Sequence, residues 1–281
     1  MDKSARIDAR IASLKDLREL FAAIQAMAAS RLQAASSALA AAHKYCDVIE
    51  SAIADAVRMD GNHRARVHWD LAPRRERAVV VICAEHGFAG AFNRHLLARA
   101  KRETAPSDKV VIVGRRGRIA APEFGLEPWT SLSMPTHVES LLPAARRLAV
   151  ELAPFANIDV VFGRYRSGSQ FDIELRQVLP LSPELLRRRD NGNDPLHQLP
   201  SAVLLHRLIE EFVLGELTML LIESTASENA ARLQIMDAAN RHIDDNLESL
   251  SKQSHRIRQE QITSELLEVV AGAEAINTMG Q

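Results

Sequence analysis

The positions of proline and glycine constrain the fold of this chain more than any other feature. All 11 prolines of the 281-residue sequence lie between Pro73 and Pro200, and neither residue type occurs in residues 1–60 or 216–271. Gly and Pro in a helix interior cost roughly 1 and 3 kcal/mol relative to Ala, so both blocks are predicted to be long helices. At about 1.5 Å per residue each helix would be about 80–90 Å long, so the two must pair or project from a body.

Apolar residues repeat in both blocks at alternating spacings of four and three. The first seam consists of Ala28, Leu32, Ala35, Leu39, Ala42, Cys46, Ile49 and Ile53. The second consists of Ile222, Ala226, Asn229, Leu233, Met236, Asn240, Ile243, Leu247, Leu250, Ser254 and Ile257, and after a slip it resumes at Ile262, Leu266, Val269, Ala273 and Ile276. This period is typical of a coiled coil. Because the blocks lie at opposite ends of the chain, an antiparallel pair is favoured; a homodimeric coiled coil is the alternative.

The middle of the chain has a different pattern, in which β-branched runs alternate with amphipathic segments. Strands are predicted at 78–83, 109–113, 158–162 and 171–179, and helices at 89–103 and 138–152. Such alternation favours an α/β domain with a largely parallel sheet. Residues 182–200 are predicted to be a polar connection. The fold class is therefore α+β or α/β: a long antiparallel coiled coil of the N- and C-terminal helices (1–60 and 201–281) with an inserted small Rossmann-like α/β domain (76–200).

Residues that could carry chemistry are few. The turn Glu85–Gly90 follows the first strand, where dinucleotide-binding folds hold phosphate, but the full G-x-G-x-x-G pattern is absent. Residues 114–118, which include three arginines, are predicted to be a solvated basic loop. The ten histidines and two cysteines lack the spacing of metal ligands. We therefore expect no catalytic residue, no cofactor and no metal site.

Composition narrows the function classes further. The net charge of −1 argues against general affinity for nucleic acid. No run of eighteen uncharged apolar residues occurs, so no transmembrane helix is expected. The first residues lack an apolar secretory core, and Cys46 and Cys83 form no disulfide framework, so a reducing, cytoplasmic setting is expected.

Several stretches resemble the gamma subunit of F-type ATP synthases. These are residues 7–14 (IDARIASL), 26–32 (AMAASRL) and 87–93 (GFAGAFN) and, as the most specific, 226–233 (ASENAARL) and 258–268 (RQEQITSELLE). Their order and spacing cover nearly the whole chain. The resemblance implies a non-catalytic central-stalk rotor subunit, which couples ion flow through the membrane sector to ATP synthesis or hydrolysis at alpha–beta interfaces.

The resemblance also implies partners and contact residues. The partners would be the hexamer of alpha and beta subunits, the epsilon subunit and the c-ring, with the α/β domain and residues 187–200 facing the last two. Membrane association would come only through the complex, which would place the chain peripherally on the cytoplasmic face of a bacterial cell membrane. Arg258 and Gln259 match the family's arginine–glutamine pair, which engages a beta-subunit loop, and Arg31 would be a basic beta contact on the first helix.

The chain departs from the family pattern in two places. Family members usually carry several lysines in the segment corresponding to 21–37, where this chain has only Arg31, and the turn at Glu85 lacks the usual aspartate–arginine. These departures favour a divergent paralogue from the alternative, N-type ATPase, in which sodium can be the translocated ion. Two other functions stay open: a nucleotide-binding α/β enzyme with helical dimerisation arms, and a non-rotary coiled-coil scaffold.

Overall fold

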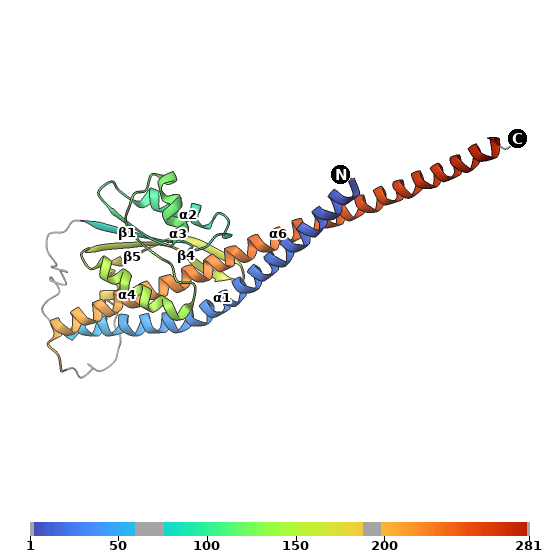
Figure 1. Ribbon diagram of the computed structural model, residues 1–281. Helices are drawn as coiled ribbons and strands as arrows, with labels where there is room; N and C mark the ends of the chain where they lie inside the picture. The colour runs from blue at the N-terminus through green and yellow to red at the C-terminus, as the bar shows by residue number, and fades with distance from the viewer. Residues whose placement is uncertain (1–2, 60–75, 188–197, 280–281) are drawn as a thin grey trace. The chain divides into compact units, whose positions relative to one another are not determined.

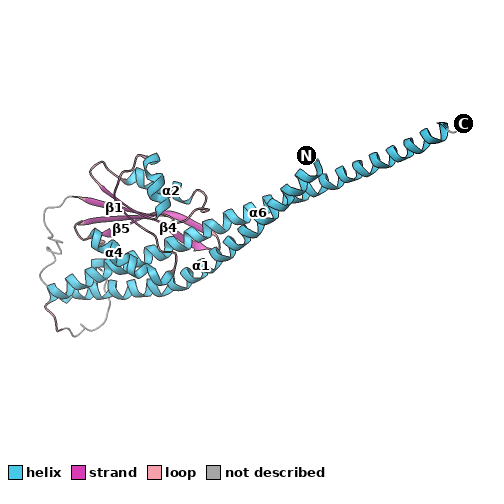
Figure 2. Cartoon of the chain, viewed as in Figure 1, coloured by secondary structure: helices cyan, strands magenta, loops and turns pink. Residues whose placement is uncertain are grey.

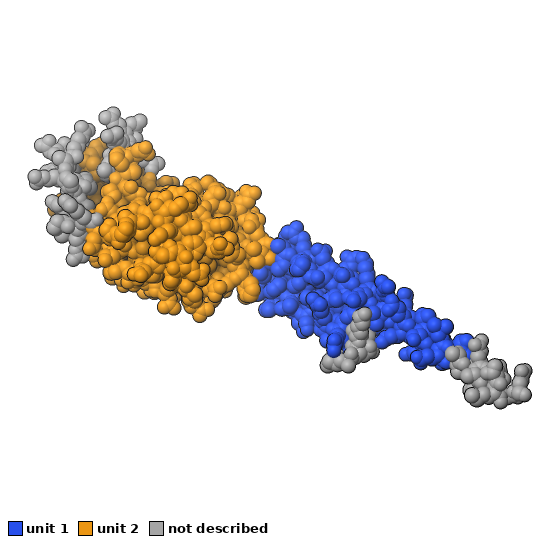
Figure 3. Space-filling view, turned by 90° about the horizontal axis from the view of Figure 1, so that it is seen from above, with its two compact units in different colours: residues 1–26, 236–281 blue, residues 27–235 orange. Residues whose placement is uncertain are grey.

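A computed structural model describes residues 3–59, 76–187 and 198–279 of the chain (Figure 1). By compactness the chain divides into unit 1, residues 1–26 and 236–281, and unit 2, residues 27–235 (Figure 3). Both terminal helices contribute to both units. The division 1–60, 76–200 and 201–281, which follows the sequence pattern, stays a prediction.

The elements in chain order are α1 (Lys3–Met59), β1 (Arg77–Ile82), α2 (Phe92–Glu103), β2 (Lys109–Val113), α3 (Arg115–Ala120), η1 (Ala121–Phe124), β3 (Pro128–Leu132), η2 (Val138–Ser140), α4 (Leu141–Leu152), β4 (Asn157–Ser167), β5 (Gln170–Leu179), α5 (Pro183–Arg187) and α6 (Ser201–Met279).

The two long helices that the proline and glycine pattern predicts are confirmed, and the second begins earlier than the pattern required. Helix α6 starts directly after Pro200, whose carbonyl oxygen accepts hydrogen bonds from the backbone N–H groups of Val203 and Leu204. Gly215 therefore lies inside the helix. A Cβ atom there would come within 3.0 Å of the Tyr45 ring on α1, so this glycine lets the two helices approach closely.

The heptad seam is also confirmed. From Ala28 to Ile53 on α1 and from Ile222 to Ile257 on α6, every seam residue is buried or half-buried. Beyond the slip in the heptad repeat, the predicted seam residues are not buried, since Ile262, Leu266 and Val269 are all exposed. The side chains beyond residue 270 lie outside the described part of the chain.

In unit 1 the two helical segments pair antiparallel. The Ser254 hydroxyl donates to the Asp8 carboxylate at 3.0 Å, and Asn240 donates through Nδ2 to Gln25 Oε1 at 2.8 Å. Between these contacts Arg18 pairs with Asp244 at 3.0 Å. Residue numbers therefore rise along one helix as they fall along the other.

Unit 2 contains a five-stranded sheet with the order β3-β2-β1-β4-β5. Its strands are magenta in Figure 2. Only the β4–β5 pair is antiparallel. The four expected strands are present, and the third extends to Ser167. Strand β3 was not predicted from the sequence. It is an edge strand with alternating exposed residues, and its first residue is Pro128, a position where a proline is tolerated in an edge strand.

The expectation of a solvated basic loop at 114–118 is wrong in part. Arg115–Ala120 form the short helix α3, with Gly117 buried against Cys83, although all three arginines are exposed. A Cβ at Gly117 would lie 2.4 Å from the Cβ of Cys83, so this glycine serves close packing of α3 on the end of β1. The two glycines among residues 114–118 lower the helix propensity of this segment, so the sequence alone did not predict the helix.

Strand β1 is buried on both faces and separates two hydrophobic layers. Ala78, Val80 and Ile82 pack with α1, α4 and α6. Val79 and Val81 face the opposite layer, which α2 and η1 cover. This period-two alternation explains the continuous apolar run in the sequence.

The predicted polar connection at 182–200 falls partly outside the described residues. Its first part contains α5, and residues 188–197 are not described, nor are residues 60–75. Among the helices that are described, none combines the length and apolar character needed to cross a bilayer.

Candidate functional site

The end of β1 is the place where an open α/β sheet of this order would bind a ligand. The strand order reverses between β1 and β4, and ligands of such sheets bind at this switch point, beyond the carboxyl ends of the strands. The turn Glu85–Gly90 leaves the sheet here, with Phe88 and Gly90 both at positive φ (64° and 55°). The turn that the sequence predicted after the first strand therefore lies at the carboxyl edge of the sheet.

Side chains of the protein itself accept hydrogen bonds from the backbone N–H groups at this edge. The Glu85 carboxylate accepts hydrogen bonds from the backbone N–H groups of Arg115 at 3.0 Å and Met134 at 2.9 Å. Asn93 Oδ1 accepts the N–H of Ala84 at 2.8 Å. An anionic ligand here would meet a carboxylate where dinucleotide folds present free backbone N–H groups.

Helix α6 covers the same switch point. Ser224 Oγ donates to the carbonyl oxygen of Ile82, at the last residue of β1, at 3.1 Å. A Cβ atom on Gly163 would come within 2.7 Å of the Ser227 Cβ, so the backbone of β4 packs closely on the Ser227 side chain of α6. The crevice that a nucleotide would need is filled by this helix, and the geometry disfavours the nucleotide-binding enzyme.

A buried ion pair on α6 fixes the turn after β1. Arg232 binds the Glu228 carboxylate at 2.5 Å and donates through Nε and Nη2 to the Gly87 carbonyl oxygen at 3.3 and 3.2 Å. Its Nη1 donates to Asn229 Oδ1 at 2.8 Å. Burial raises the pKa of Glu228, and the charges of Arg232 and Arg31 oppose this effect. We call Glu228, Arg232 and the Gly87 carbonyl the turn clamp.

Two further buried carboxylates on α6 face α1 and the β-hairpin. Glu216 pairs with Arg176 of β5 at 2.8 Å, and Glu223 pairs with His43 of α1 at 3.3 Å. Desolvation raises the pKa of both carboxyls, and their basic partners oppose it. Burial likewise raises the pKa of the Cys46 thiol to about 12, which leaves the thiol protonated and unreactive at neutral pH.

Comparison with known proteins decides the family. A family model described as ATP synthase matches residues 3–276. The ATP synthase gamma chain of Solibacter usitatus is 31% identical over 285 residues, which cover 95% of this chain and 96% of that protein. The chain belongs to the ATP synthase gamma chain family. That of Hyphomonas neptunium is 28% identical over 95% of this chain and 97% of its own length.

Solved structures support the fold. A Euglena gracilis mitochondrial ATP synthase structure, titled OSCP/F1/c-ring, contains a chain that matches 99% of this chain and 96% of its own length, with a TM-score of 0.67 at 14% identity. A chain in the central stalk/c-ring of the Tetrahymena thermophila enzyme matches with a TM-score of 0.58, covering 78% of this chain and 99% of that chain. Membership of the gamma family makes this chain a non-catalytic subunit of its complex.

The three residues predicted to contact beta subunits lie in different units. Arg258 and Gln259 are exposed neighbours on α6 in unit 1, and Arg258 Nη2 lies 3.8 Å from Asp8 Oδ2. Arg31 is a half-buried residue of α1 in unit 2. The beta-subunit contacts of all three residues stay predictions.

The residues of the turn clamp were not predicted as a functional group from the sequence. Glu228 and Arg232 stood within the most specific family block, and their spacing of four residues on a helix is that of an ion pair. What the sequence could not show is that the pair is buried and that its guanidinium reaches the Gly87 carbonyl, 145 residues away along the chain. In the described part of the chain, no three His, Cys, Asp or Glu side chains are grouped as metal ligands would be.

Proposed function

We propose that this chain is the non-catalytic central-stalk rotor subunit of a rotary ATP synthase and couples ion flow through the membrane sector to ATP synthesis or hydrolysis at alpha–beta interfaces. The observation that carries the proposal is the antiparallel pairing of the two chain ends in a protein of the gamma family. A rotor acts by contacting alternative states of its neighbours differently, since equal contact in every state would shift no equilibrium.

The proposed partners are the alpha–beta hexamer, the epsilon subunit and the c-ring. The structural neighbours, which are chains of a central stalk/c-ring and of an OSCP/F1/c-ring assembly from other organisms, support these partners. The chain would be a peripheral part of a membrane-associated complex, and the cytoplasmic face of a bacterial membrane is the finer location that we propose. Origin from an N-type ATPase is supported by the single basic residue, Arg31, in segment 21–37.

Arg258, Gln259 and Arg31 are the proposed contacts with beta subunits. The Arg258 guanidinium is 60% exposed, and its contact with Asp8 is a long one of 3.8 Å. Both properties leave its donors available for a carboxylate of another subunit, for which the planar arginine fork is suited. The exposed apolar residues of α6 from Ile262 to Val270 fit a helix end that another protein surrounds.

The test is reconstitution of the chain with the alpha, beta and membrane-sector subunits of its own complex. Arg258→Ala should lower coupled ATP synthesis severalfold and leave assembly intact. Arg256→Ala is the matched control, because Arg256 is also an exposed arginine, two residues away, whose charge pairs with Glu260 at 2.9 Å. It should retain synthesis near the unsubstituted level.

The outcomes separate the alternatives. Equal loss in both variants would remove Arg258 from the proposed contact. A chain that does not assemble with alpha and beta subunits and forms a stable homodimer would instead support the coiled-coil scaffold.

A further inference from the structure

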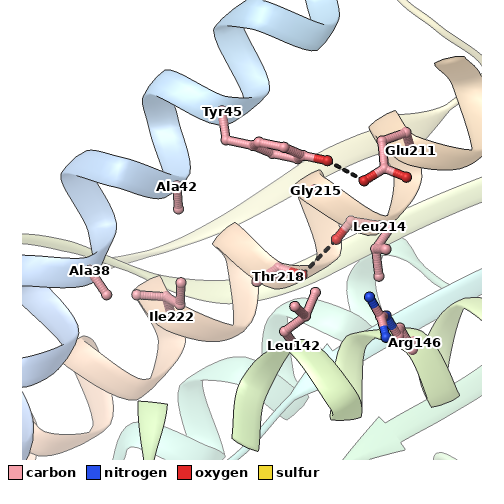
Figure 4. Close-up of a pocket in the computed structure, with 10 residues that line it drawn as sticks. All are labelled: Ala38, Ala42, Tyr45, Leu142, Arg146, Glu211, Leu214, Gly215, Thr218 and Ile222. Carbon is pink, nitrogen blue, oxygen red and sulfur yellow. Dashed lines mark hydrogen bonds between the residues drawn. The ribbon is translucent and has the colours of Figure 1, made fainter. Parts of the chain in front are cut away.

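A cavity in unit 2 lies between α1, α4 and α6, and no residue of the turn clamp lines it (Figure 4). Its volume is about 340 Å³, within the range of small-molecule sites. Most of its wall is apolar. The lining side chains of this kind are Ala38 and Ala42 from α1, Leu142 from α4, and Leu214 and Ile222 from α6.

The polar groups of the cavity, except one, are bound within the protein. Thr218 Oγ1 donates to the Leu214 carbonyl at 2.7 Å, and the Tyr45 hydroxyl donates to the Glu211 carboxylate. The pKa of Tyr45 is raised to about 12 by burial and by Glu211, so this hydroxyl stays protonated and remains a donor to the carboxylate. Both groups are therefore less available to a ligand.

Arg146 is the exception. It lines the cavity from α4, and within the described residues its guanidinium has no hydrogen bond or ion pair. Figure 4 shows Arg146 and Glu211 near the same end of the cavity and Ala38 and Ile222 at the other. The cavity therefore has an apolar end and an end with an available cation, and the Glu211 carboxylate, which also lines the cavity, disfavours a second negative charge.

We propose that this cavity binds an amphipathic monoanion, a small molecule with an apolar body and one carboxylate. The apolar body lies along Ala38, Ala42 and Ile222, and the carboxylate takes a charge-assisted hydrogen bond from Arg146. Binding between three helices would favour their packed arrangement by mass action. The proposal does not depend on the rotor function.

The test uses decanoate as the probe and the purified full chain, by isothermal calorimetry below the concentration at which decanoate forms micelles. Decanol is compared as the probe without charge. Saturable binding of decanoate at one site per chain is expected, with decanol about tenfold weaker because it lacks the interaction with the guanidinium. Arg146→Leu should weaken decanoate about tenfold and leave decanol unchanged.

Arg147→Leu is the matched control, since Arg147 is the next residue of α4, is exposed and does not line the cavity. It should retain the affinity of the unsubstituted chain. Ala42→Leu should abolish binding of both probes by filling the apolar end, with circular dichroism confirming that each variant is folded. Absence of saturable binding, equal affinity for decanoate and decanol, or equal loss from Arg146→Leu and Arg147→Leu would each overturn the proposal.

Discussion

The same helix, α6, carries arginine–acid pairs of identical spacing in both units, and their surroundings differ. In unit 2, Arg232 and Glu228 are 2.5 Å apart with side chains only 6% and 9% exposed. In unit 1, Arg241 and Asp237 are also 2.5 Å apart, but they are 73% and 55% exposed. The helical spacing is shared, so a difference in the energetic importance of the pairs comes from burial and from the further hydrogen bonds of Arg232 to Gly87 and Asn229.

The comparison extends to how α6 is held. In unit 2 the helix is positioned by buried and part-buried polar contacts with β1 at Ile82, with the following turn at Gly87 and with β5 at Arg176. In unit 1 it is held by a narrow apolar seam with polar interruptions at Asn240 and Ser254. We infer that substitutions of these polar contacts in unit 2 lower the free energy of unfolding more than substitutions in the helix pair of unit 1 do.

The largest effect is expected from Arg232→Met. The variant leaves Glu228 buried without its cation, and breaking a buried pair in this way costs about 3–5 kcal/mol. Burial already raises the folded-state pKa of Glu228, and a carboxyl of this kind loses stabilising effect as pH rises through that pKa. The free energy of unfolding in urea should therefore fall more at pH 8 than at pH 5.

Arg241→Met in unit 1 is the control for this variant. It removes the same interaction from an exposed pair, and the expected cost is about 0–0.5 kcal/mol with little dependence on pH. Similar losses for the two variants would break the comparison between the units.

A smaller effect is expected from Gly163→Ala. The added Cβ would lie 2.7 Å from Ser227 Cβ and 2.8 Å from a Phe92 ring carbon, and overpacking of this kind costs about 1–3 kcal/mol. Gly87→Ala is the control, because a Cβ there meets no atom within 4 Å. Thermal unfolding should separate the two, and an unchanged midpoint for Gly163→Ala would contradict the close contact of β4 with α6.

In unit 1 the double variant Gln25→Leu/Asn240→Leu should be neutral or stabilising by about 1 kcal/mol. It replaces a hydrogen-bonded polar pair between the two helices by two apolar side chains. The free-energy cost of burying polar groups is removed, and no polar group is left without its partner. Hydrogen exchange of amides in 3–26 and 236–260 measures this region by itself. Faster exchange throughout these segments would show that the polar pair is required for pairing.

The smallest change is expected from Arg258→Ala. Its contact with Asp8 is exposed and 3.8 Å long, so its removal should cost less than about 0.5 kcal/mol of unfolding free energy. Urea unfolding of the full chain measures this cost. A large loss of stability would mean that any defect in ATP synthesis reflects folding rather than contact with a beta subunit.

The sequence predicted the parts of the fold that repeat, and missed those that depend on single contacts. Two long helices, the seam through Ile257 and four strands followed from periodicity and from the absence of helix breakers. Strand β3 and helix α3 are short, with Pro128 and Gly117 at positions where tertiary contacts override local propensity.

The candidate site divides in the same way. The sequence located the turn at Glu85–Gly90. It could not show that Glu85 accepts a hydrogen bond from the Arg115 N–H or that Arg232 donates to the Gly87 carbonyl oxygen. These contacts join residues 30 to 145 positions apart, and no local pattern encodes such a distance. Nor could the sequence show that Arg146 shares a cavity with Tyr45 and Glu211, since three separate helices bring them together.

The most direct test of the account is whether the two ends of one chain pair with each other in the observed register. Cysteines introduced at Gln25 and Asn240, which are hydrogen-bonded at 2.8 Å, should be joined within a single chain by a short bismaleimide. The native Cys46 and Cys83 are buried with raised thiol pKa values, so they should not react. We expect rapid cross-linking within the monomer for this pair and none when Gln25→Cys is combined with a cysteine at Glu268. Cross-links only between two chains, or equal reaction of both pairs, would contradict the antiparallel helix pair.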